Sequence, residues 1–256
     1  MSWVFIFSAF FIGAIVGSFL NVVIYRLPRG KSLVKPSSRC SSCRSAIPAW
    51  QNIPLLSYLI STGRCSHCGA IYSLRYFGVE LLTGLFFVAI YFHFGISIQS
   101  FLVACLVSIL ISASFIDLEL KIIPDEISLG GWAFFLFTAL LGDGIMGLSF
   151  WEAVIGSLIG FSSFWILSRA YYFVMGEEGL GGGDVKLMGM IGAALGVKAV
   201  LTSVLVGSLV GAIVSLFLIL ALKKGRRFPI PFGPFLAAGA LVSLFELDFW
   251  QVWISR

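Results

Sequence analysis

The chain has 256 residues, of which 59% are hydrophobic and only 11% are charged. Soluble domains carry about 25% charged residues, so this composition excludes an ordinary soluble protein and predicts a multi-pass membrane protein. The formal net charge of +5 does not indicate nucleic-acid binding, because the positions of the basic residues between apolar runs explain it. We expect one polytopic domain with one small soluble insert.

Apolar runs follow one another along the chain, and we expect an all-α fold: a polytopic membrane helix bundle of about eight spans. A helix needs about 20 residues to cross a bilayer. The expected spans cover residues 3–24, 77–94, 98–116, 127–142, 151–170, 187–196, 199–222 and 229–247. The sixth is short and rich in glycine, so we expect it to be a partly embedded helix that also lines a cavity.

The basic residues fix the expected orientation of these spans. Of the 17 lysines and arginines, all except Lys198 and Arg256 lie in connecting segments that share one side of the membrane or, like Arg169, at the adjoining end of a span. The positive-inside rule assigns that side to the cytoplasm and places both termini outside. The segments 25–76, 117–126 and 171–186, and the basic cluster Lys223-Lys224-Gly225-Arg226-Arg227, are then cytoplasmic.

The first cytoplasmic segment contains two C-x2-C pairs separated by twenty-one residues: Cys40, Cys43, Cys65 and Cys68. Two such turns can direct four thiolates toward one point, which is typical of a structural zinc site. Two disulfides, or a redox-active pair, are the alternatives; a reducing cytosol disfavours the disulfides. We expect His67 to be a bystander and Cys105 a small buried hydrophobic residue.

We therefore predict three regions: a first transmembrane span (1–24), a cytoplasmic four-cysteine zinc insert (25–76) and a transmembrane bundle (77–256). Glycines four residues apart let membrane helices approach closely, so we expect packing roles for Gly13 and Gly17, Gly156 and Gly160, Gly192 and Gly196, and Gly207 and Gly211. Asn21 is an amide near a span end, and it either joins two helices or lines a substrate groove.

Two aspartates end or begin apolar runs on the predicted cytoplasmic side. Asp117 follows the third run, and Asp184 follows three glycines at the start of the sixth. An ionisable group at such a position is a candidate functional residue, and two nearby carboxylates can share a proton and act as acid and base. The alternative is that both are helix caps. We read Asp125, which follows Pro124, mainly as the cap of the next helix.

Several motifs occur together in a characteristic order. They are Gly17-Ser18-Phe19-Leu20-Asn21-Val22-Val23-Ile24-Tyr25-Arg26-Leu27-Pro28, the two cysteine pairs, Ile116-Asp117, Ile123-Pro124-Asp125, the G-x-G-D element at Gly181–Asp184, and Pro231-Phe232-Gly233-Pro234-Phe235-Leu236. With this set, nearly the whole chain resembles the bacterial type IV prepilin peptidases, the bifunctional leader peptidase/N-methyltransferases. G-x-G-D alone is shared with presenilin-like proteases, whereas the full set is specific.

The resemblance implies a membrane aspartyl endopeptidase in the bacterial cytoplasmic (inner) membrane, with Asp117 and Asp184 catalytic at the cytoplasmic face. Its substrates would be prepilins or pseudopilins with a basic leader and a hydrophobic stalk, cut after a glycine. S-adenosylmethionine would then methylate the new N-terminal residue. We see no Rossmann signature, so no residues are assigned to this methyl donor. The alternatives are a peptidase without methyltransferase activity and a small non-enzymatic membrane transporter.

Overall fold

A computed structural model describes residues 3–35, 37–40, 42–47, 53–142, 144–177, 179–221 and 230–245. Within these ranges every named element is a helix, and β-structure is limited to isolated bridges between Arg39 and Ala46 and between Arg64 and Ile71. The predicted all-α class is therefore confirmed. The basic cluster at 223–227 and Arg256, both used to orient the spans, lie outside the described residues.

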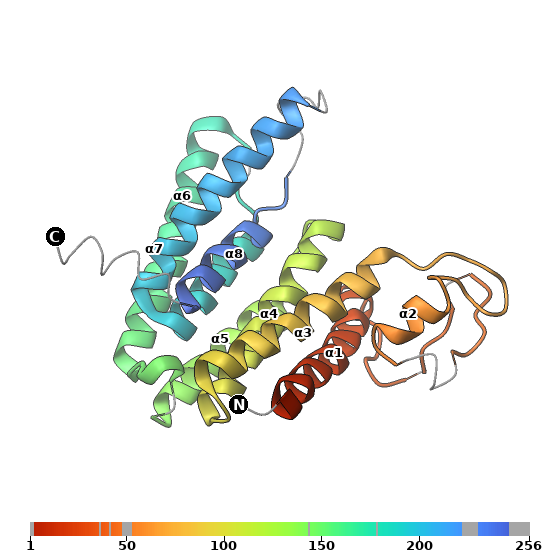
Figure 1. Cartoon of the computed structure of the whole chain (residues 1–256). Coiled ribbons are helices and arrows are strands. Elements are labelled where there is room, and N and C mark those ends of the chain that lie inside the picture. Colours follow the sequence, from red (N-terminus) through yellow and green to blue (C-terminus); the bar gives the residue numbers. More distant parts are fainter. Residues whose placement is uncertain are drawn as a thin grey trace. The chain divides into compact units, whose positions relative to one another are not determined.

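The chain divides into two compact units, Met1–Ser112 and Ala113–Arg256. Unit 1 contains α1 (Trp3–Arg26), the short η1 (Leu27–Arg29), α2 (Leu56–Ile60), α3 (Leu74–Phe94) and the first part of α4 (Ile98–Leu120). Helices α1 and α3 lie side by side (Figure 1). A Cβ at Gly13 would meet Phe87, and one at Gly17 would meet the backbone of Glu80, so both glycines permit this close packing. Their predicted packing role is confirmed.

Asn21 joins the same two helices. Its side chain is buried, and Nδ2 donates to the carbonyl oxygen of Tyr76 on α3 at 3.0 Å and to that of Gly17 at 3.3 Å. A buried amide in a membrane helix needs such partners, because the bilayer core offers none. Of the two roles considered for Asn21, the structure shows the interhelical contact.

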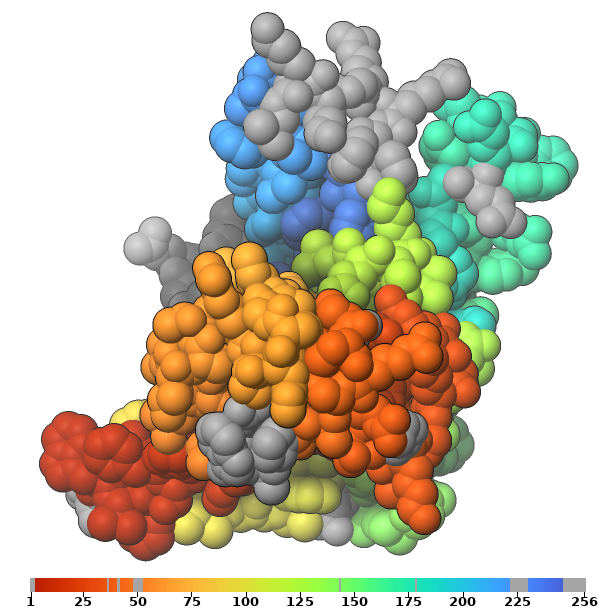
Figure 2. All heavy atoms as spheres, turned by 90° about the vertical axis from the view of Figure 1, so that its right-hand side faces the viewer, coloured from red at the N-terminus to blue at the C-terminus, as the bar shows by residue number. Residues whose placement is uncertain are grey.

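The insert between α1 and α3 is attached to α3 by Glu80. This carboxylate is buried, and Oε2 accepts a hydrogen bond of 2.7 Å from the backbone N–H of Leu55 in the insert. Leu55 has a φ of +62°, an uncommon conformation for a residue with a side chain. The surrounding contacts must hold it there, and the bond to Glu80 is one of them. Figure 2 draws the described atoms of the insert in orange tones.

We expect Glu80→Ala to destabilise the insert, because the partly buried N–H of Leu55 loses its acceptor. Leaving such a donor unpaired costs about 1–3 kcal/mol. Glu80→Gln is the matched control, since its amide oxygen can still accept the bond. Hydrogen exchange across residues 53–72 should rise in the alanine variant and change little in the glutamine variant. Equal protection in both variants and the wild type would show that this bond does not hold the insert.

Unit 2 contains the end of α4, then α5 (Asp125–Leu140), η3 (Ile145–Gly147), α6 (Phe150–Met175), α7 (Gly182–Leu220) and α8 (Gly233–Leu244). Helix α6 starts with a capping box in which Ser149 and Glu152 satisfy each other's backbone N–H groups. It runs to Met175, five residues beyond the span expected from hydropathy. Helix α7 packs against α5, α6 and α8 and occupies the centre of this unit.

The 39 residues of α7 form two arms rather than one rod, because Gly196 interrupts the helix with a φ of +77°. Gly160 of α6 lies against both the carbonyl of Met188 and the side chain of Val200. Those two residues would be about 18 Å apart along a straight helix, so the chain turns back at Gly196. The break agrees with the predicted division between the sixth and seventh spans.

Among the described residues, five helices are long and apolar enough to cross a membrane: α1, α3, α4, α6 and α7. Helix α8 is apolar but short, and α5 has 16 residues. Counting the two arms of α7, the described residues contain eight apolar helical segments, which agrees approximately with the eight predicted spans. The chain is a multi-pass membrane protein built of helices.

Candidate active site and cysteine cluster

Asp117 lies in the last turn of α4. The helix was expected to end at residue 116, but it continues to Leu120, and Lys121 ends it with a φ of +58° and an N–H bond to the carbonyl of Asp117. The carboxylate is only 5% exposed, and Oδ2 accepts a 2.9 Å hydrogen bond from the backbone N–H of Gly233. The side chain of Asp117 therefore does not cap its own helix or the next one; within unit 2 it accepts the first N–H of α8.

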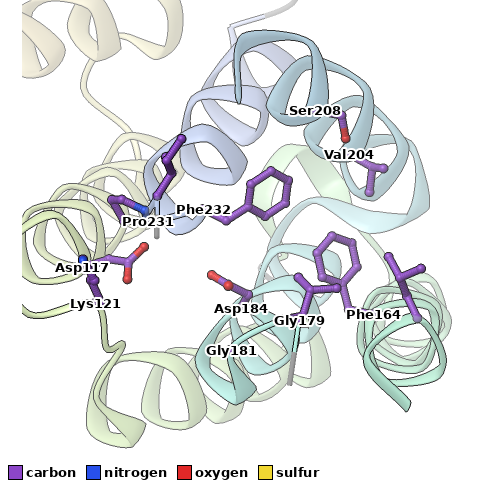
Figure 3. Close-up of a pocket in the computed structure, with 13 residues that line it drawn as sticks. Asp117, Lys121, Phe164, Gly179, Gly181, Asp184, Val204, Ser208, Pro231 and Phe232 are labelled. Atoms are coloured by element: carbon purple, nitrogen blue, oxygen red, sulfur yellow. The ribbon is translucent and has the colours of Figure 1, made fainter. Parts of the chain in front are cut away.

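Asp184 lies in the first turn of α7, three residues after Gly181, the N-cap. A carboxylate there interacts favourably with the positive end of the helix dipole. Asp184 is also buried, at 8% exposure. In Figure 3 its carboxyl group points toward that of Asp117. The structure thus brings together the two aspartates that the sequence singled out.

Both aspartates line one pocket of about 470 Å³, which lies entirely within unit 2. Phe164 and Phe232 form part of its apolar wall, with ring centroids 6.4 Å apart and nearly parallel planes (Figure 3). Its full lining is Asp117, Lys121, Phe164, Leu167, Gly179, Leu180, Gly181, Asp184, Val204, Ser208, Ile230, Pro231 and Phe232. The pocket combines a few polar groups with a mainly apolar wall, as ligand sites usually do.

Ile123 lies against the N-terminal ends of both α7, which carries Asp184, and α8, whose first residue contacts Asp117. A Cβ at Gly183 would lie 2.9 Å from the Ile123 side chain, and a Cβ at Gly233 would lie 3.1 Å from its Cδ1. Glycines at residues 181–183 could let a substrate backbone come close. Gly181 does line the pocket, but Gly183 is needed for packing against Ile123.

The predicted capping role of Asp125 is wrong. Helix α5 begins at Asp125 itself, Pro124 occupies the N-cap position, and no side-chain cap bond forms. The side chain of Asp125 instead pairs with Lys186 on α7 at 2.6 Å. The sequence could not show this pair, because the two residues are 61 positions apart and meet only through tertiary packing.

The four predicted metal ligands, Cys40, Cys43, Cys65 and Cys68, form one cluster in unit 1, with all four sulfur atoms within 4.8 Å of one another. The Sγ atoms of Cys40 and Cys68 are 3.8 Å apart, and those of Cys43 and Cys65 are 4.0 Å apart. Four thiolates bound tetrahedrally at about 2.3 Å would be about 3.8 Å apart. The geometry therefore fits a four-coordinate metal ion, and His67 is not part of the cluster.

Two similar turns build the cluster. In each, the first cysteine accepts an N–H from the residue four positions later, Arg44 in one turn and Gly69 in the other, and that residue has a positive φ. The N–H groups of Cys68 and His67 lower the pKa of Cys65 to about 5. For Cys68, the N–H of Ala70 lowers the pKa, but the neighbouring sulfurs outweigh it and raise the pKa to about 11. Four crowded thiols need a cation among them before all can ionise, which also fits a metal site.

Sequence reasoning missed most of the pocket wall. Phe164, Val204 and Ser208 come from the middle of apolar helices, where nothing distinguishes a pocket residue from a lipid-facing or packing residue. Gly233 lies in a quoted motif, but its contact with Asp117 spans 116 positions and follows only from the fold.

Fold and site together define a multi-pass helical membrane protein with two buried carboxylates at one pocket and a separate four-cysteine cluster. Residues 11–94 match the model of the bacterial peptidase A24 N-terminal domain, and residues 104–216 match that of the type IV leader peptidase family. The chain is 36% identical to a prepilin leader peptidase/N-methyltransferase of Neisseria gonorrhoeae, over 94% of this chain and 90% of that protein.

Proteins of the same name from Aeromonas hydrophila and Pseudomonas aeruginosa are 36% and 34% identical, over 95% and 94% of this chain and 91% and 90% of their own lengths. No solved structure is matched. With these matches, the chain belongs to the type IV leader peptidase family.

Proposed function

We propose that this protein cleaves the leader peptide of prepilins or pseudopilins and methylates the new N-terminal residue. The observation that carries the peptidase activity is the shared pocket of Asp117 and Asp184, two buried carboxylates on different helices. The relatives named above carry both activities in their names.

The proposed chemistry is acid–base hydrolysis with the two aspartates sharing one proton. The ionised carboxylate takes a proton from water as the water oxygen bonds to the scissile carbonyl carbon. The protonated carboxyl group donates to the leaving nitrogen as the carbon–nitrogen bond breaks. Burial supports this division of roles, since two close carboxylates in a poorly solvated site do not both ionise easily.

The proposed substrate places its hydrophobic stalk in the bilayer and its basic leader in the cytosol. Asp117 and Asp184 lie in end turns of their helices, which is consistent with a scissile bond at the membrane boundary. The apolar pocket wall suits a substrate side chain next to that bond, and the stalk would pack among spans as another membrane helix does. A leader in the cytosol requires an active site at the cytoplasmic face of the bacterial inner membrane. The positive-inside rule separately places both termini outside.

For the cysteine cluster we propose a structural zinc ion, because all four positions of a tetrahedron are filled by thiolates and no open position remains for catalysis. S-adenosylmethionine would supply the methyl group for the amine freed by cleavage. The division into a first span (1–24), a zinc insert (25–76) and a peptidase bundle (77–256) remains a prediction.

We further propose that Glu177 and Glu178, just before the glycine run, help to hold the basic leader. Glu177 is exposed in the turn after α6, and Glu178 lies outside the described residues. We expect charge reversal of both to lysine to slow cleavage of a basic-leader substrate severalfold at low salt, where such contacts are least screened. A substrate with a neutralised leader is the control, and the rate of its cleavage should fall much less. Unchanged turnover of the basic-leader substrate would contradict this role.

The function is tested by intact-mass spectrometry of a prepilin co-expressed with the wild-type protein in cells that lack their own peptidase. We expect the mass of the leader to be lost and the mass of one methyl group to be gained. Cleavage without methylation would indicate a peptidase that lacks methyltransferase activity. An unprocessed prepilin, in the presence of folded protein in the membrane, would contradict the proposal.

A further inference from the structure

The N-terminus of α8 makes a direct contact with one of the two aspartates. The backbone N–H of Gly233, the first residue of this helix, donates to Oδ2 of Asp117 at 2.9 Å in a buried position. The first N–H groups of a helix have no partner within it and carry a partial positive charge. Helix α8 thus provides one charge-assisted hydrogen bond to one oxygen of Asp117.

The residue at this position has to be small. A Cβ at position 233 would lie 2.8 Å from Asp117 Oδ2 and 3.1 Å from Ile123 Cδ1. Pro234 follows, and proline is favoured in the first turn of a helix because it needs no N–H partner there. Gly233 allows the backbone to approach the carboxylate of Asp117 closely, and Pro234 favours the start of the helix at this point. Together they direct the Gly233 N–H toward the carboxylate.

The charged groups around the pocket are Asp117 and Lys121 from α4 and its end, and Asp184 from α7. Asp125 and Lys186, at the starts of α5 and α7, pair with each other. Asp184 lies beside the backbone of Gly181, the N-cap of its own helix. That contact is local to α7, whereas the donor to Asp117 comes from a different helix and depends on where α8 packs.

We propose that the Gly233 N–H is a positioning donor for cleavage, which orients the Asp117 carboxylate and favours its ionised form. Asp117 is then the base that takes the proton from water, and Asp184 holds the shared proton and acts as the acid. A hydrogen bond to a carboxylate favours the charged form, so with one proton between two carboxylates this bond shifts the charge toward Asp117. The assignment rests on the proposed peptidase function.

The test replaces the Gly233 residue with glycolic acid in the full-length protein, which turns its amide into an ester, removes the N–H and weakens the Phe232 carbonyl as an acceptor. The same ester change at Phe150, the first residue of α6 and not part of the pocket, is the matched control. We expect kcat/KM for cleavage of a prepilin to fall about 10- to 100-fold, as for loss of a hydrogen bond to a charged group. Methylation of an already cleaved substrate should stay at the wild-type rate.

The pH profile separates this role from a structural one. The acid limb of kcat/KM reports ionisation of the base in the free enzyme, and without the donor it should move to higher pH by about one to two units. A wild-type rate and profile, or a slower rate with an unmoved limb, would overturn the proposal. If wild-type protein itself cleaves nothing, the proposed function fails instead.

Gly233→Ala is a second variant, which ordinary mutagenesis can make. It tests the proposed role of the Gly233 N–H if the ester variant does not fold. Its Cβ presses on Asp117 Oδ2 while the N–H remains, so the carboxylate must move away from the donor. We expect the same direction of change in rate and in the acid limb. A wild-type profile in this variant would also overturn the proposal.

Discussion

Asp117→Asn and Asp184→Asn are each expected to lower the rate of leader cleavage by about 10²- to 10⁴-fold, the usual contribution of a general acid or base. Asparagine keeps the shape of the side chain and can still accept the N–H bond from Gly233 at position 117. It cannot exchange the proton that the proposed mechanism needs. The measurement is the initial rate of cleavage by purified protein, with circular dichroism and yield from membranes to confirm the fold.

Asp125→Asn is the matched control for these variants. Asp125 follows Asp117 by eight residues but pairs with Lys186 and does not line the pocket. Partly exposed ion pairs contribute about 0–1 kcal/mol, so this variant should keep most of the wild-type cleavage rate. Substantial processing by either of the other two variants would remove that aspartate from the proposed active site.

Serine at any one of the four clustered cysteines is expected to abolish metal binding and to unfold the insert locally. The four ligands act as a unit, since the free energy of metal binding is also the free energy that folds such a site. A single substitution of Cys40, Cys43, Cys65 or Cys68 should therefore be nearly as harmful as two. Metal content of the purified protein and hydrogen exchange across the insert are the measurements.

Methylation should suffer more than cleavage in these cysteine variants, because Asp117 and Asp184 belong to unit 2 and the cluster to unit 1. Cys105→Ser is the matched control: Cys105 lies on α4, outside the cluster, and its substitution should leave metal content unchanged. An equal collapse of both activities in the cluster variants would indicate that the insert supports the whole fold. A protein that holds its insert and contains no metal would contradict the metal site.

Local sequence patterns were enough to predict the helices, the cysteine cluster and the two aspartates. The apolar runs predicted the helices, and the expected boundary between the sixth and seventh runs coincides with the break at Gly196. The paired C-x2-C spacing predicted the cluster, because each turn is built within six residues and needs only one long-range contact with the other. Asp117 and Asp184 were recognised because carboxylates are rare in an apolar chain.

The features that sequence reasoning missed depend on packing between distant segments. The Gly233 donor, the Asp125–Lys186 pair and the Leu55–Glu80 bond each join residues far apart in the chain. Asp125 follows a proline at a helix start, where capping is the usual local role, but the available partner on α7 determines its side-chain contact instead. Two helix ends also differ from the expected span ends: α4 continues through Asp117 and Glu119, which hydropathy assigns to a loop, and α6 continues through residues 171–175.

The central claim is that Asp117 and Asp184 act as one acid–base unit, and the cleavage rates of the two single asparagine variants and of the double variant test it most directly. When two groups act as a unit, the effects of substituting them do not add, because removing either group already removes the shared step. We predict that the double variant cleaves a prepilin no more slowly than each single variant does. Losses that add in the double variant would show two independent contributions and contradict the claim.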